Sequence, residues 1–188
     1  MAITYVAAGA GAAANNAAVT PALPAGWAQN DLLLCWATIK DNLATLAINS
    51  GWSEYFTGYG ATGAHRHSLF YKIATASEAN PTVTPSGGDV GDTVLAQCCA
   101  FRGTATASPF DVLGSLSENA EAVVDQNIGP ITGITPTVND GCVIVLGHKG
   151  DDWTSVAVLT GDGLTWAEIG EPDSTLGTDA GIVWDYAI

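Results

Sequence analysis

The second half of this 188-residue sequence loosely repeats the first half. A turn signal that runs into an apolar segment at 30–36 returns at 139–146, residues 46–54 resemble 158–168, and residues 69–74 resemble 182–187. The offset is 109 residues at the first match (140 minus 31), 114 at the tryptophans (166 minus 52) and 113 at the last match (182 minus 69). Insertions in loops between fixed strands produce drift of this size. Because a solenoid needs at least three copies of a repeat of about 20 to 50 residues, the echo predicts one domain with approximate internal pseudo-symmetry.

β-compatible runs alternate with turn clusters from residue 31 onward, and no stretch of a dozen residues has a convincing helical period. Both alternating faces of residues 94–101 are apolar, as expected for a central strand of packed sheets. The sequence therefore predicts an all-β, single-domain fold, a two-sheet sandwich or jelly roll. The predicted strands are 31–39, 43–48, 52–57, 66–74, 81–84, 92–102, 110–116, 122–125, 142–148, 154–159, 165–169 and 180–187.

The first 20 residues are rich in Ala, Gly and Asn, and they contain one short apolar segment, Ile3, Tyr5 and Val6. We interpret residues 1–20 as an N-terminal arm or an edge strand, and residues 21–188 as the sandwich domain. An arm would become ordered against a neighbouring subunit on assembly. An edge strand would simply begin the sandwich.

The chain is strongly acidic, with 19 Asp and Glu against five Lys and Arg and a formal net charge of −14. Such a surface repels phosphate backbones, so nucleic acid is not an expected partner. No run approaches the roughly 20 apolar residues that cross a bilayer, and the N-terminus does not have the pattern of a secretory signal. We therefore expect that the protein does not associate with a membrane and that it is made in a cytoplasm.

The four cysteines do not have the spacing of a zinc or redox motif. Cys98 and Cys99 are adjacent and should point to opposite faces of a strand. All four lie in apolar runs, where a free cysteine behaves as a small buried hydrophobe. A disulfide between Cys35 and Cys142 stays open as an alternative, because the echo matches the two positions.

The densest group of candidate metal ligands is His65-Arg66-His67, in which strand alternation would put both imidazoles on one face. A metal site would need a third ligand, and we favour a solvated strand entry instead. Residues 148–152 read as a polar turn. The sequence contains no phosphate-binding glycine loop, nucleophile elbow or calcium loop. We therefore predict no metal, no cofactor and no enzymatic activity; turnover dependent on His65 or His67 is the least favoured alternative.

Aromatic residues raise the question of sugar binding, because flat rings stack on sugars. Trp36, Trp166 and Trp184 lie in or beside predicted strands and should fill the core. The aromatic residues near turns are the better candidates for exposed contacts: Trp27, Tyr55, Tyr59 and Trp153.

Several phrases resemble a group of tailed-phage virion proteins with β-sandwich domains. The phrases are the Pro/Gly turn and strand at 23–34, the Gly-Trp at 51–52, the segment 70–74, Phe101-Arg102-Gly103 with Pro-Phe-Asp at 109–111, and the Thr-Pro-x-Val turn at 135–138. They are spread over most of the chain, but each is short. Members of this group are capsid decoration or cement proteins, tail or fibre components, or other virion proteins.

The resemblance implies a non-catalytic role in binding other virion subunits or a host surface. We expect a decoration or cement protein on the outer capsid surface, which binds the major capsid protein and itself, as a homotrimer by analogy with threefold lattice sites. The alternative is a carbohydrate- or receptor-binding domain of a tail tip or fibre. The candidate interface residues are Ile3, Tyr5, Val6, Trp27, Tyr59 and Trp153.

Overall fold

The fold is all-β, as the sequence predicts. The computed structural model describes residues 2–59, 65–115, 133–150, 159 and 163–188, and these contain twelve strands and no helix. The described residues therefore hold no helix that could cross a membrane. The strands are β1 (Thr4–Ala8), β2 (Ala12–Asn15), β3 (Leu32–Ile39), β4 (Thr45–Ile48), β5 (Ser53–Tyr59), β6 (Arg66–Ile73), β7 (Val83–Ser86), β8 (Thr93–Arg102), β9 (Val143–Lys149), β10 (Trp166–Gly170), β11 (Asp173–Ser174) and β12 (Ala180–Ala187).

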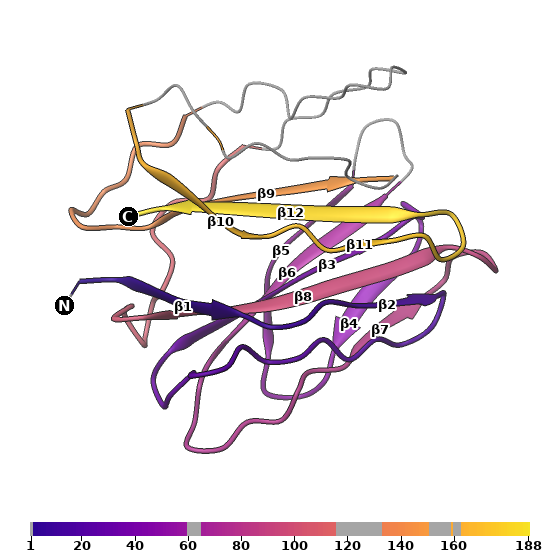
Figure 1. Ribbon diagram of the computed structural model, residues 1–188, viewed down its shortest axis with the longest axis horizontal. Helices are drawn as coiled ribbons and strands as arrows, with labels where there is room; N and C mark the ends of the chain where they lie inside the picture. The colour runs from indigo at the N-terminus through magenta and orange to yellow at the C-terminus, as the bar shows by residue number, and fades with distance from the viewer. Residues whose placement is uncertain (1, 60–64, 116–132, 151–158, 160–162) are drawn as a thin grey trace.

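The strands form two main antiparallel sheets and one small ribbon. The six-stranded sheet has the order β1-β8-β3-β6-β5, and β2 also pairs with β8. In the four-stranded sheet, β12 pairs with β9, β10 and β11. β4 and β7 form a two-stranded ribbon. Figure 1 shows the four-stranded sheet above the six-stranded sheet, with the β4–β7 ribbon at the lower right.

The two main sheets form the predicted sandwich, and the six-stranded sheet is also covered on its other face. Trp36 and Leu34 of β3 pack toward Ile182 and Trp184 of the four-stranded sheet. The alternate side chains of β3 and β8 pack with Val19 and with the ribbon residues Leu46 and Val83. β3 and β8 are therefore buried on both faces, which explains their continuous apolar runs. Jelly-roll connectivity is not confirmed by these strand orders.

The echo in the sequence corresponds to a repeated strand order. β6 lies between β3 and β5 in one sheet, and β12 lies between β9 and β10 in the other. Leu34 of β3 faces Tyr71 of β6, and Leu146 of β9 faces Trp184 of β12. A glycine with positive φ precedes the second strand of each unit, at Gly51 (91°) and Gly163 (80°). The matched segments are therefore equivalent elements of the two halves.

The N-terminal segment lies at the edge of the six-stranded sheet. β1 and β2 both pair antiparallel with β8. Between them, the Gly9 N–H donates to the Cys98 carbonyl at 2.8 Å. Val19 then forms an isolated bridge with Val83 of β7. In the single chain this segment is thus an edge strand rather than a projecting arm.

Three of the strand predictions need comment. The strand expected at 110–116 is wrong for residues 110–115, which are irregular; Asp111 instead accepts a hydrogen bond from the Thr137 backbone N–H at 2.6 Å. The strands expected at 122–125 and 154–159 lie outside the described residues, except Leu159, which is not in a strand. β2 and β11 were not predicted, because one is almost all Ala and the other has only two residues.

All four cysteines are free thiols, so the Cys35–Cys142 disulfide is absent. Cys98 and Cys99 lie in cores on opposite faces of β8, which confirms the alternation. Cys98 faces Cys35 directly across β3 and β8. Burial raises the pKa of the half-buried Cys142 to about 12. Cys35, Cys98 and Cys99 are thus buried core groups, and burial disfavours the reactive thiolate form of Cys142.

Two of the phrases that carry the family resemblance meet in an ion pair. Arg102, at the end of β8, donates from Nε to Asp31 Oδ1 at 2.9 Å and from Nη2 to Oδ2 at 2.8 Å. Asp31 also accepts from the Ala28 N–H. Burial alone would raise the pKa of Asp31, but these hydrogen bonds and the charge of Arg102 lower it below its ordinary value. These phrases therefore fasten the turn before β3 to the end of β8.

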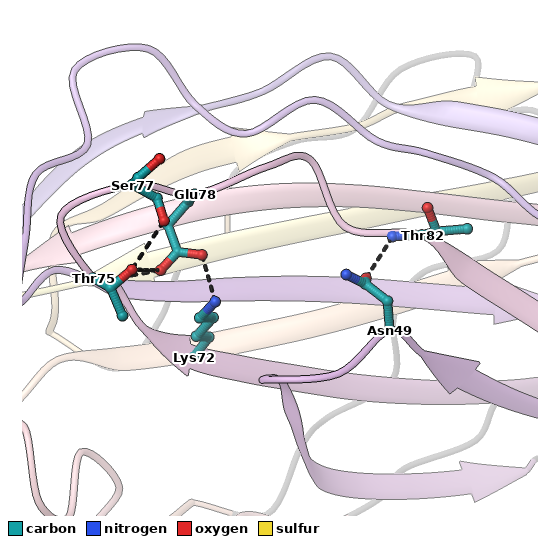
Figure 2. Close-up of polar contacts among 6 residues, drawn as sticks. All are labelled: Asn49, Lys72, Thr75, Ser77, Glu78 and Thr82. Carbon is teal, nitrogen blue, oxygen red and sulfur yellow. Dashed lines mark hydrogen bonds and ion pairs between the residues drawn. The ribbon is translucent and has the colours of Figure 1, made fainter.

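A second buried carboxylate fastens the loop between β6 and β7. Figure 2 shows Glu78 between Lys72 and Thr75. Glu78 Oε2 accepts from Lys72 Nζ, and Oε1 accepts from the Thr75 N–H at 2.7 Å and from its hydroxyl at 2.8 Å. Further along the same loop, Asn49 Oδ1 accepts from the Thr82 N–H at 2.7 Å. The loop is thus held to β6 and to the turn after β4.

Candidate functional site

The predicted interface residues do not form one exposed patch. Ile3 and Tyr5 pack into the core between the two main sheets, where the Tyr5 ring lies 4.8 Å from the Tyr186 ring. Val6 and Trp27 pack against a separate cluster on the other face. Tyr59 ends β5, but its side chain and all of Trp153 lie outside the described residues. The four described candidates are therefore half-buried packing residues.

The candidate sugar-binding aromatics are also engaged within the chain. The Tyr55 ring stacks on Phe110 with centroids 3.7 Å apart and planes 15° apart. Trp27 is half-buried against the core. Trp36 and Trp184 are buried, as predicted, while Trp166 is half-buried. The Tyr55 ring is therefore stacked on Phe110 and does not offer that face to a sugar.

All three histidines of the chain gather in one cluster between the main sheets. His67 on β6 and His65 just before it point to the same side, and His148 on β9 faces them from the other sheet. His67 Nδ1 lies 2.9 Å from His148 Nε2, a hydrogen bond in which one nitrogen donates and the other accepts. The His65 and His148 ring centroids are 5.2 Å apart. The cluster therefore brings His148 next to two residues that lie 81 or more positions before it in the sequence.

The strand pattern explains how His65 and His67 come together. Alternation puts both rings on the inner face, while Arg66 points to the opposite face and donates to the Ala44 and Asn42 carbonyls. This confirms the shared face that we predicted for the pair, but the solvated strand entry that we favoured is wrong, because His67 is buried between the sheets. The prediction of a polar turn at His148 is wrong, because β9 continues to Lys149 and turns the His148 ring inward.

The walls of the cluster are aromatic rings and close backbone. The His67 ring lies 5.1 Å from Trp36 and 5.5 Å from Phe56. A Cβ on Gly58 would lie 2.6 Å from His67 Nε2, and a Cβ on Gly150 would lie 2.6 Å from the His65 ring. The two glycines therefore leave the room that the imidazoles occupy.

The electrostatics of the cluster disfavour the imidazolium form. Burial, and after it the charges of His148, Arg66 and His65 in that order, lower the pKa of His67 to about 3. Lys40 is also nearby, since its ammonium donates to the Gly150 carbonyl at 3.0 Å. His67 is therefore neutral at pH 7.

The three imidazoles are not arranged as metal ligands. No group of three or more His, Cys, Asp or Glu side chains in the described part of the chain is placed to hold a metal ion. The 2.9 Å between His67 and His148 is a hydrogen-bond distance. Chemically, the cluster can share one proton between the His67 and His148 rings, and the binding of an extra proton would put a charge on this largely buried pair.

A second feature at the same end of the sandwich is a group of exposed aliphatic side chains on three loops. Leu43 is 83% exposed, Val90 is fully exposed and Leu176 is 45% exposed. The loops touch, because a Cβ on Gly87 would lie 3.6 Å from the Leu43 carbonyl oxygen and the Thr178 N–H donates to the Gly91 carbonyl at 3.0 Å. We call Leu43, Val90 and Leu176 the loop surface.

The loop surface is connected to the histidine cluster. Lys40 Nζ donates both to the Thr178 carbonyl, beside the loop surface, and to the Gly150 carbonyl, beside His65. In the sequence, this region is marked only by the glycine-rich segment 87–92, which has the composition of a turn. Loops 40–44 and 175–179 carry no comparable signal.

No family model, curated protein or solved structure matches this chain. Its function must therefore be inferred from the residues and their geometry.

Proposed function

We propose that this chain is a non-catalytic structural protein of a tailed-phage virion. In this role it would be made in the host cytoplasm and bound as a decoration or cement protein to the outer capsid surface. Its partners would be the major capsid protein and other copies of itself, arranged as a trimer. Many copies that each bridge neighbouring subunits can stabilise a shell through individually weak contacts.

The loop surface is the observation that carries this proposal. Exposed aliphatic side chains scattered singly are ordinary on a protein, whereas grouped ones mark contact sites. Leu43, Val90 and Leu176 lie on loops that touch one another, and these loops are fixed by backbone hydrogen bonds and by Lys40. A prearranged apolar group of this kind loses little conformational entropy on docking.

The distribution of charge supports a partner with basic side chains. The basic residues Lys40, Arg66, Lys72 and Arg102 bind groups of the chain itself. Most of the 19 carboxylates are not matched by a cation of this chain. An acidic surface around an apolar contact favours a shell with complementary positive charge, which would also speed association.

The family resemblance supports the same class of protein. Its phrases at 30–34 and 101–103 meet in the Asp31–Arg102 ion pair, where they hold the sandwich together. Residues with such a role are expected to recur in proteins that share a sandwich. They are not expected to mark a catalytic site.

A binding experiment with particles that lack this protein tests the proposal. The double variant Leu43→Ser with Val90→Ser should bind such particles at least tenfold more weakly than the original chain, because central apolar contacts dominate binding energy. The control is Val138→Ser, which removes a 56% exposed aliphatic side chain from the segment before β9, away from the loop surface. The control should bind within twofold of the original chain.

Surface substitutions of this kind change stability by only about 0.5 kcal/mol, so thermal unfolding of both variants should match the original protein. Equal binding by the double variant and the original chain would show that the loop surface does not contact the shell. Saturable binding to a host glycan instead of particles would favour the receptor-binding alternative.

A further inference from the structure

The histidine cluster occupies a position where it can control the contact between the two main sheets. His67 belongs to the six-stranded sheet and His148 to the four-stranded sheet, and their rings share one hydrogen bond. Beside them, the Trp36 indole N–H donates to the Gly147 carbonyl of β9 at 3.2 Å. Both contacts cross the sandwich at the same place, between β9 on one side and β3 and β6 on the other.

An extra proton is unfavourable in this arrangement. One extra proton keeps one donor and one acceptor at the 2.9 Å contact but puts a positive charge on the largely buried His67–His148 pair, and two extra protons would place two N–H groups against each other. The surrounding charges make the charged state still less favourable. His148 of β9, Arg66 of β6 and His65 just before β6 all act on His67.

The described groups around His67 add no compensating negative charge. Trp36 of β3 and Phe56 of β5 are neutral, and Lys40 at the end of β3 adds a positive charge near Gly150. Lys149 follows His148 on β9. Asp151 and Asp152, the next residues in the sequence, lie outside the described residues.

We propose that the His65, His67 and His148 cluster is an acid-sensitive contact, at which protonation separates β9 from the six-stranded sheet while the rest of the sandwich stays folded. β9 is the element expected to move, because all its described side chains are only half-buried and it pairs with one described strand, β12. β6 is fixed between β3 and β5.

The sign of the pH dependence follows from proton linkage. An exposed histidine titrates near pH 6.5, so the separated state binds a proton that the closed state excludes at all pH values between about 6.5 and 3. Stability of the contact is therefore complete above about pH 6.5 and declines as the pH falls. For one extra proton, the equilibrium for separation rises about tenfold for each pH unit.

Two indole N–H groups give a direct test in the unmodified protein. The Trp36 indole bonds to Gly147 of β9, while the Trp184 indole bonds to Gln97 Oε1 on β8 at 2.6 Å, also across the sheets. Hydrogen exchange of both would be followed by NMR from pH 7.5 to 4.5, with correction for the intrinsic rate. Protection of Trp36 should fall about tenfold per pH unit below pH 6.5, and protection of Trp184 should change less than twofold.

The double variant His67→Gln with His148→Gln removes both titrating rings, and its Trp36 protection should be independent of pH within twofold. His65→Gln is the matched control and should retain most of the pH dependence. Constant Trp36 protection in the original protein would overturn the proposal, and so would parallel loss at Trp36 and Trp184, which indicates global unfolding. Retained pH dependence in the double variant would also overturn it. The comparison of the two indoles needs no variant, so a failure of the double variant to fold leaves the test intact.

Discussion

Replacement of Trp184 by alanine is expected to lower the free energy of unfolding by about 3–5 kcal/mol, the usual cost of deleting a large buried ring. Trp184 is completely buried on β12 and packs between the two main sheets. Its indole N–H also donates to Gln97 Oε1, whose amide in turn donates to the Gly9 carbonyl at 3.1 Å. The variant therefore creates a cavity and removes the N–H group that donates to the buried side-chain oxygen of Gln97. Urea denaturation followed by circular dichroism measures the loss.

The cavity and the hydrogen bond can be separated with a smaller change. Trp184→Phe keeps most of the apolar volume but leaves Gln97 Oε1 without its donor, at a cost of about 1–3 kcal/mol. Gln97→Leu in the same background removes the orphaned oxygen, so the double variant should be less destabilised than the sum of the single variants. Strictly additive losses would contradict a direct Trp184–Gln97 interaction.

The second large effect is expected at Gly9, where the chain passes from β1 to β2. A Cβ at this position would collide with the backbone carbonyl of Ala22. Because the obstacle is backbone and not a flexible side chain, Gly9→Ala should cost about 1–3 kcal/mol, as overpacking does. Hydrogen exchange should also become faster at the amides of β1 and β2, since the segment must move away from residues 22–23.

Gly133→Ala is the matched control for this variant. A Cβ on Gly133 would meet nothing within 4 Å, and its φ is not positive. The control should unfold within about 0.5 kcal/mol of the original protein. If Gly9→Ala were as stable as Gly133→Ala, the N-terminal segment would not be packed along β8, and a detached arm would be the better description of residues 1–20.

Much of the architecture could be predicted because strands leave a local pattern. The alternation at 94–101 predicts a strand buried on both faces, and β8 is buried on both faces. The echo predicts two equivalent units, which correspond to the strand orders β3-β6-β5 and β9-β12-β10 in the structure. Short strands without a pattern, such as the Ala-rich β2, were missed because their pairing with β8 depends on tertiary contacts.

The candidate site was less predictable for the same reason. The pairing of His65 and His67 on one face follows from their spacing, but His148 comes from a strand in the other sheet. The segment His-Lys-Gly-Asp-Asp at 148–152 has the composition of a turn, and the pairing of β9 with β12 extends the strand through its first two residues. The interface prediction for Tyr5, Val6 and Trp27 rests on their positions near a terminus or turns, and in the single chain these residues pack against the core.

The loop surface also had no signature in the sequence. Leu43, Val90 and Leu176 are single aliphatic residues in three polar turns, separated by 47 and 86 positions (90 minus 43 and 176 minus 90). Their proximity arises only because the ends of β3, β7 and β12 meet at one end of the sandwich. Figure 1 shows this end, with the turns before β8 and β12, at the right.

A cryo-electron microscopy map of the intact virion that contains this polypeptide tests the proposed function most directly. The proposal predicts repeated copies of the sandwich on the outer capsid surface, with Leu43, Val90 and Leu176 facing the major capsid protein or a neighbouring copy. Copies attached through the opposite end would contradict the role of the loop surface. Absence of the chain from the capsid, or its presence only at the tail, would contradict the decoration or cement function itself.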